Sequence, residues 1–188
     1  MEKLHTRATV LIVPGLRDHV ADHWQTLLEA RLARVHSVAP LTEDKLNCQA
    51  RVDAIQQALA GIDGPVILVA HSAGVLMAVH WAATHRRPIL GALLVTPPDL
   101  DAPWPSYYPS PQAMHGGGWI PLPRTQLPFA SLVAMSRNDP LASQDAVRAM
   151  ALDWGSELVD IGEVGHLNPA SGFGPWPEAE ALLRRLDI

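Results

Sequence analysis

The sequence predicts a three-layer α/β fold, in which a doubly wound parallel sheet of about six strands carries helices on both faces. Two observations lead to this prediction. Short apolar runs alternate with stretches of helical periodicity, and a β-α-β-α order implies parallel strands joined by right-handed crossovers. Most of the runs are also nearly continuous in hydrophobicity, which is typical of central strands that are covered on both faces.

Six runs are the expected strands. The second is the least apolar, so we expect it at an edge of the sheet. In chain order the runs are Thr9–Val13, Arg34–Val38, Val66–Ala70, Leu90–Thr96, Ser131–Ser136 and Glu157–Ile161.

Five stretches between and after these runs are the expected helices. The first follows Asp22 and places Trp24, Leu27, Leu28, Leu32 and Val35 at helical spacing. Another, Ala73–His85, follows the third strand directly. Sequence signals bound the other three: Asn47 and Ser143 as N-caps, glycine after the helix at Gly61 and Gly155, and Pro177 in the first turn of the last helix.

A Pro- and Gly-rich segment interrupts this alternation. Residues 97–128 contain both tyrosines and two tryptophans, and they are too many for an ordinary connection. Loops of this length are often binding loops or lids, so we interpret the segment as an insertion or lid loop. The length suits a single domain over residues 1–188, and no internal repeat is present.

Composition excludes several classes of function. The net charge is −5 and the lysines and arginines are scattered, so no basic stripe is available to bind nucleic acid. No apolar stretch is long enough to cross a membrane. The only cysteine is Cys48, which rules out an intrachain disulfide and favours a reducing compartment. We therefore expect a soluble, cytoplasmic protein.

The clearest chemical motif lies where the third strand turns into a helix. The pentapeptide from Ala70 to Gly74 matches the nucleophile-elbow pattern G-x-S-x-G except for alanine at its first position. Such a turn exposes the Ser72 hydroxyl above the sheet. It also aims backbone N–H groups of the helix, above all that of Ala73, at a developing oxyanion. The alternative interpretation is that Ser72 only caps the helix.

Two further residues follow later strands in the order that a serine elbow requires. Asp139 comes just after the fifth strand and His166 just after the sixth. Alone, Asp139 could be a turn residue and His166 a surface histidine. Because parallel strands end at one edge of the sheet, the three residues are expected to meet there. They predict a triad in which His166 is the general base and Asp139 orients it.

Other candidate residues are weaker. We expect the N–H of Leu16, after the first strand, as the second oxyanion donor, although that loop could be a plain turn. His71, Trp104, Tyr107 and Trp119 are candidates for substrate binding, with Tyr108 beside them.

No cofactor or metal is expected. His19 and His23 stand four apart without a third ligand cluster, and Gly116–Gly118 lacks the residues of a phosphate loop. We interpret that triple glycine as a flexible part of the lid. Cys48 has no evident histidine partner.

These motifs resemble a known family, the small serine hydrolases grouped with retinoblastoma-binding protein nine and the bacterial YdeN proteins. Four blocks carry the resemblance: Val13-Pro14-Gly15 with Asp22-His23-Trp24-Gln25, the elbow, Ser136-Arg137-Asn138-Asp139-Pro140, and Gly165-His166 through Ser171-Gly172-Phe173-Gly174 to Trp176-Pro177. The resemblance implies a minimal α/β-hydrolase fold with strand order 2-1-3-4-5-6 and little or no cap domain. It also implies a triad at Ser72, Asp139 and His166. Ala70 and the long Pro-rich loop depart from the family pattern.

Two functions remain open from the sequence. The first is a serine hydrolase that cleaves small carboxylic esters, with amides and thioesters as alternatives, through an acyl-enzyme and without a cofactor. Its partner is then a small-molecule substrate. The second is a non-catalytic module that binds a protein partner on a hydrolase fold. The complete triad favours the first.

Overall fold

The sheet is parallel throughout and contains six strands. The computed structural model describes residues 3–188. Its strand order is β2-β1-β3-β4-β5-β6, which confirms the predicted topology. The three-residue second strand lies at one edge, as expected. The strands are β1 (Thr9–Val13), β2 (Val35–Ser37), β3 (Val66–His71), β4 (Gly91–Val95), β5 (Ser131–Met135) and β6 (Glu157–Asp160).

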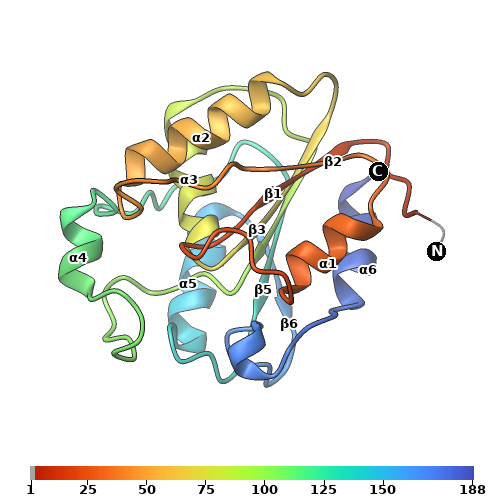
Figure 1. Ribbon diagram of the computed structural model, residues 1–188. Coiled ribbons are helices and arrows are strands. Elements are labelled where there is room, and N and C mark those ends of the chain that lie inside the picture. The colour runs from red at the N-terminus through yellow and green to blue at the C-terminus, as the bar shows by residue number, and fades with distance from the viewer. Residues whose placement is uncertain (1–2) are drawn as a thin grey trace.

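Helices cover both faces of this sheet. Figure 1 shows α1 and α6 on one face, and α2, α3 and α5 on the other. The short α4 stands outside the layers. The helices are α1 (Trp24–Arg31), α2 (Cys48–Ala60), α3 (Ala73–Thr84), α4 (Pro111–Gly116), α5 (Gln144–Trp154) and α6 (Glu178–Leu186), with one 3₁₀ turn, η1 (Pro169–Ser171).

The core consists of two apolar layers separated by the sheet. Successive residues of β1 point to opposite faces, so Leu11 packs among the helices α2, α3 and α5, whereas Ile12 packs with α1 and α6. All residues of β3, β4 and β5 are buried. Their apolar runs are continuous because neither face of these strands meets water. Each large aliphatic side chain buried in this way contributes about 1.5–3 kcal/mol.

The predicted helix signals have their expected local roles. The Asn47 side chain accepts a hydrogen bond from the Ala50 N–H at 2.9 Å, and Ser143 caps α5 in the same way through Ala146. Gly155 ends α5 in the left-handed conformation with φ of 66°. One assignment is corrected. The first helix ends at Arg31, and Val35 pairs with Val10 in the sheet instead of extending the helical face.

Part of the segment 97–128 is folded against the body. It contains α4. Ser110 caps the N-terminus of this helix, because its hydroxyl accepts a hydrogen bond from the Ala113 N–H at 3.2 Å. The Gly117 carbonyl accepts from the N–H of Cys48 at 2.8 Å, at the start of α2. A Cβ atom at Gly117 would lie 2.0 Å from the Leu46 carbonyl oxygen, so this glycine allows a close approach of two backbones. The triple glycine expected as flexible lid thus includes a tight packing contact.

Candidate active site

Ser72 occupies the sharp turn between β3 and α3. Its backbone has φ of 57° and ψ of −130°, a conformation that is strained for a residue with a side chain. The turn brings α3 so close to β1 that a Cβ atom at Gly74 would lie 2.3 Å from the Val13 carbonyl oxygen. The Ser72 side chain makes no capping hydrogen bond to the helix. The capping interpretation therefore does not describe this serine.

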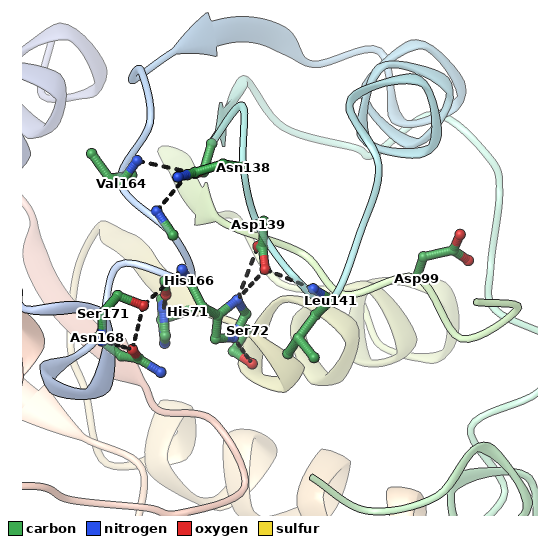
Figure 2. Close-up of polar contacts among 12 residues, drawn as sticks. His71, Ser72, Asp99, Asn138, Asp139, Leu141, Val164, His166, Asn168 and Ser171 are labelled. Carbon is green, nitrogen blue, oxygen red and sulfur yellow. Dashed lines mark hydrogen bonds and ion pairs between the residues drawn. The ribbon is translucent and has the colours of Figure 1, made fainter. Parts of the chain in front are cut away.

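The side chains of Ser72, His166 and Asp139 form one hydrogen-bonded line. The Ser72 Oγ lies 2.7 Å from His166 Nε2, and His166 Nδ1 lies 2.9 and 3.0 Å from the two carboxylate oxygens of Asp139 (Figure 2). This spacing suits a hydroxyl that donates to Nε2 and an Nδ1–H that donates to the carboxylate. Both His166 and Asp139 are 2% exposed in their side chains, so His166 is not a surface histidine.

The loops that carry Asp139 and His166 are joined by hydrogen bonds. The Asn138 side-chain oxygen accepts from the Gly165 N–H at 2.7 Å and from the Ser136 hydroxyl at 3.1 Å. Ser136 Oγ in turn accepts from the Val164 N–H at 3.3 Å. These contacts set the acid loop and the histidine loop at a fixed separation. Sequence reasoning did not single out Asn138, although it directly precedes the predicted acid.

The histidine loop also has internal support. The Ser171 hydroxyl accepts from the His166 N–H at 3.0 Å and donates to the Asn168 side-chain oxygen at 2.8 Å. Gly165 has φ of 58°, and a Cβ atom there would lie 2.7 Å from Ser171 Oγ. The spacing Asn-x-x-Ser is a cap-like signal, since Asn168 also accepts from the Ser171 N–H at 2.9 Å. This signal could have identified the support from the sequence.

Two more histidines lie next to His166. The Nε2–H of His71 donates to the His166 backbone oxygen at 2.9 Å, and the His23 ring lies 4.5 Å from the His71 ring. Burial lowers the pKa of His23 to about 4, with a further contribution from the charge of His166. Burial likewise lowers the pKa of His71 well below its ordinary value. His71 reaches the cavity wall, but its Nε2 is occupied by the backbone of His166.

The expected oxyanion donors both border the space in front of Ser72. Ala73 and Leu16 line the same cavity, and a Cβ atom at Gly15 would lie 3.4 Å from Ser72 Cβ. The Gly15 carbonyl accepts from the Asp18 N–H at 3.0 Å, which closes a turn after β1. This turn therefore places backbone beside the hydroxyl. The positions of Ala73 and Leu16 suit the predicted roles, which stay predictions.

A buried arginine that the sequence did not indicate holds this turn. Arg51 of α2 is 3% exposed in its side chain and forms an ion pair with the Asp18 carboxylate. It also donates to the Leu16 carbonyl oxygen at 3.3 Å and to the Lys45 carbonyl oxygen at 3.1 Å. Asp18 itself has φ of 57°. No sequence signal pairs these two residues, because 33 positions separate them.

The triad opens into a cavity of about 360 Å³. Trp104, Tyr107 and Tyr108 of the segment 97–128 line it, as proposed for a binding wall. The Tyr108 ring lies 5.9 Å from the His166 ring, and its hydroxyl accepts from the Asn168 side-chain N–H at 3.3 Å. Burial raises the pKa of Tyr108. The long segment is thereby tied to the histidine loop.

Trp119 is a correction to the predicted binding wall. Its side chain is fully buried outside the cavity, and its indole N–H donates to the Leu46 carbonyl oxygen at 2.7 Å. It packs in the core layer beside α2 and α3 because the backbone contact of Gly117 draws the segment inward at this point. An apolar pattern in a loop indicates burial but does not distinguish a cavity wall from an anchor.

The other residues considered from the sequence, His19, His23 and Cys48, have no catalytic or metal-binding arrangement in the described part of the chain. His23 caps α1 by accepting from the Gln25 N–H through Nδ1 at 3.2 Å, and His19 is exposed. Within residues 3–188 no three His, Cys, Asp or Glu side chains are placed to hold a metal ion. Burial raises the pKa of the Cys48 thiol to about 11, which disfavours the nucleophilic thiolate. No helix in the described part of the chain is long and apolar enough to cross a membrane.

Comparison with known proteins gives one family and one fold. The family model described as serine hydrolase matches residues 10–185. A YdeN-like hydrolase from Pectobacterium atrosepticum is 31% identical with a TM-score of 0.78, and the match covers 96% of this chain and 93% of that one. No curated protein matches the chain by sequence.

More distant structures share the fold. The ydeN gene product of B. subtilis is 16% identical with a TM-score of 0.72, and the match covers 95% of this chain and 98% of that one. A thermophilic esterase from Thermogutta terrifontis is 18% identical with a TM-score of 0.62, over 100% and 93% of the two chains. These matches confirm the predicted α/β-hydrolase fold and the resemblance to YdeN-like proteins.

Proposed function

The chain belongs to the serine hydrolase family, and from this premise we propose that it cleaves small carboxylic esters through an acyl-enzyme formed on Ser72. The observation that carries the proposal is the 2.7 Å contact between Ser72 Oγ and His166 Nε2, at the wall of an open cavity. The Asp139 carboxylate on the far side of the imidazole completes the arrangement that activates a serine.

The reaction proceeds in two halves. In the first, Ser72 Oγ attacks the ester carbonyl carbon while His166 Nε2 takes the hydroxyl proton. The carbonyl oxygen becomes an oxyanion that the N–H groups of Ala73 and Leu16 stabilise. When the intermediate collapses, the bond to the alcohol oxygen breaks, and His166 returns the proton to that oxygen. Asp139 keeps the Nδ1–H directed at itself and stabilises the imidazolium.

In the second half, water replaces the alcohol. His166 removes a proton from the water as its oxygen attacks the acyl carbon, and it then protonates Ser72 Oγ as the acid leaves. The backbone contact from His71 and the hydroxyl of Ser171 hold the His166 backbone through both halves. Both steps are complete with the residues named and one water molecule.

The size of the cavity supports short acyl groups. Pockets for drug-sized ligands span about 300–1,000 Å³, and the cavity here, about 360 Å³, is near the lower end. Its aromatic wall, formed by Trp104, Tyr107 and Tyr108, suits apolar acyl or alcohol groups. Amides and thioesters share the same first step and are alternatives that differ only in the leaving group.

A fluorophosphonate probe tests the serine, and a series of 4-nitrophenyl esters tests the substrate class. Wild-type protein should be labelled, and Ser72→Ala should lose both labelling and roughly 10⁴-fold or more of the hydrolysis rate. Within the series, kcat/KM should be highest for short acyl chains and fall for long ones.

Ser143→Ala is a matched control, because Ser143 caps α5 and does not line the cavity. It should be labelled like the wild type, because Ser72 is unchanged. Folded wild-type protein that resists the probe and cleaves none of the esters would contradict the proposal and favour a protein-binding module instead.

A further inference from the structure

An arginine at the cavity wall has no acidic partner. Arg17 lines the cavity, and the central carbon of its guanidinium lies 5.9 Å from the centre of the Tyr108 ring. Among residues 3–188 no ion pair joins Arg17 to a carboxylate. The contact with the face of Tyr108 orients the guanidinium without neutralising its charge.

The other charged side chains near this wall have partners within the protein. The Asp18 carboxylate pairs with buried Arg51 and, at 3.3 Å, with Lys45. Asp139 is occupied by His166. Burial keeps the nearby His23 neutral at physiological pH by lowering its pKa to about 4. One carboxylate cannot neutralise both Arg51 and Lys45, so this wall carries surplus positive charge even though the chain as a whole has a net charge of −5. Within residues 3–188, Arg17 is the cation of the cavity lining that shares no carboxylate of the protein.

Arg17 is also close to the reacting groups. It follows Leu16, whose backbone borders Ser72. The ring of Tyr108 lies 5.9 Å from the Arg17 guanidinium and 5.9 Å from the His166 imidazole. Arg17, Tyr108, His166 and Ser72 all line the same cavity, so a ligand group held by Arg17 would share that cavity with an ester at Ser72.

We propose that Arg17 binds a carboxylate of the substrate, so that the preferred substrates are esters that carry a second, ionised acid group. The planar guanidinium fork matches a carboxylate in shape and can donate two parallel hydrogen bonds. The inference rests on the proposed esterase function and narrows its substrate class. The acid group can belong to the acyl part or to the alcohol part of the ester.

The test compares matched charged and neutral esters. Mono-4-nitrophenyl adipate and 4-nitrophenyl hexanoate differ by an acid group on acyl chains of equal length, and 4-carboxyphenyl butyrate and phenyl butyrate place the difference on the alcohol. Arg17→Gln should lower kcat/KM about tenfold or more for the charged ester of one pair, as expected for loss of a charge-assisted hydrogen bond. For both neutral esters the change should stay within about twofold. Arg17→Lys should give an intermediate loss, because it keeps the charge but not the fork.

Arg148→Gln is the control, since Arg148 is an exposed arginine of α5 that does not line the cavity. It should leave all four rates unchanged. The charged ester whose kcat/KM falls shows whether Arg17 binds a carboxylate of the acyl part or of the alcohol part. Equal losses for charged and neutral esters, or no loss for either charged ester, would overturn the role of Arg17 and leave the esterase function standing. Absence of Ser72-dependent hydrolysis of the neutral esters would instead overturn the proposed function, and this inference with it.

Discussion

The two small residues of the elbow have unequal roles. Ala70 is fully buried in β3, where it pairs with Val13 and Leu94, and the structure accommodates its methyl group in the core. Gly74 has no such room, because a Cβ atom there would lie 2.3 Å from the Val13 oxygen and 2.7 Å from the Pro14 oxygen. The departure from the G-x-S-x-G pattern therefore falls at the position that tolerates it.

Gly74→Ala should consequently destabilise the protein by about 3 kcal/mol or more, because the added methyl group meets rigid backbone. Gly116→Ala is the matched control, since a Cβ atom there meets nothing within 4 Å and alanine favours the helix. It should leave stability unchanged or raise it by about 0.5 kcal/mol. Urea unfolding of the two variants measures both values. Equal stability of both variants would contradict the close contact between α3 and β1.

Among the elements, α2 acts on the active site from outside it. Its Arg51 fixes the turn after β1 through the Asp18 carboxylate and the Leu16 carbonyl oxygen. The helix start is itself held by the Gly117 backbone of the long segment. One helix thus connects the segment 97–128 with the loop that should complete the oxyanion hole.

Removing the Arg51 side-chain charge should separate stability from catalysis. Arg51→Met leaves a largely buried Asp18 carboxylate with only Lys45 beside it, so we expect a loss of about 3 kcal/mol in the free energy of unfolding. The double variant with Asp18→Asn removes both charges and should recover most of this loss. Neither variant restores the hold on the turn, so kcat should fall about tenfold or more in both while KM changes little.

Thermal melts and steady-state kinetics with a short 4-nitrophenyl ester measure the two effects. If kcat recovered together with stability in the double variant, Arg51 would have a structural role only. A rise in KM at constant kcat would point to substrate binding instead of support for the oxyanion hole.

At the scale of the whole molecule, the features that the sequence predicted are those that depend on neighbouring residues in the chain. The strands β3, β4 and β5 were predictable because a strand buried on both faces needs a continuous apolar run. The caps Asn47 and Ser143 were predictable because a cap acts within three residues. The meeting of Ser72, Asp139 and His166 followed from parallel topology. The helix α4 carried the local signal Ser110-Pro111, which the surrounding prolines and glycines obscured.

The missed features depend on contacts that no short pattern encodes. Arg51 and Asp18 meet only because α2 packs beside the turn after β1. Trp119 is drawn into the core by a backbone contact at Gly117. Asn138 bridges two loops whose separation is set by the pairing of β5 with β6. Each of these contacts depends on the assembled sheet. The triad residues could therefore be predicted from the sequence, whereas the residues that support them could not.

The buried histidines make the stability of the whole protein dependent on pH. Burial lowers the pKa of His23 to about 4, whereas the unfolded chain has the ordinary value of 6.5. Between these values the unfolded state binds more protons than the folded state, so stability is fully present above pH 6.5 and is lost as the pH falls toward 4. His23 alone should account for about 3 kcal/mol over this window, and His71 adds a loss of the same sign.

His23→Asn isolates this contribution, because asparagine can still cap α1 but does not titrate. Urea unfolding of wild type and variant at several pH values between 4 and 7 gives the free energy of unfolding as a function of pH for each protein. In the difference between the two curves, the contributions of the titratable groups that both proteins share cancel. The variant should lose less stability than wild type as the pH falls, by about 3 kcal/mol over the full window. Parallel stability curves would mean that His23 takes up its proton in the folded protein as readily as in the unfolded chain. The His23 ring would then be hydrated in the folded protein instead of shielded from water.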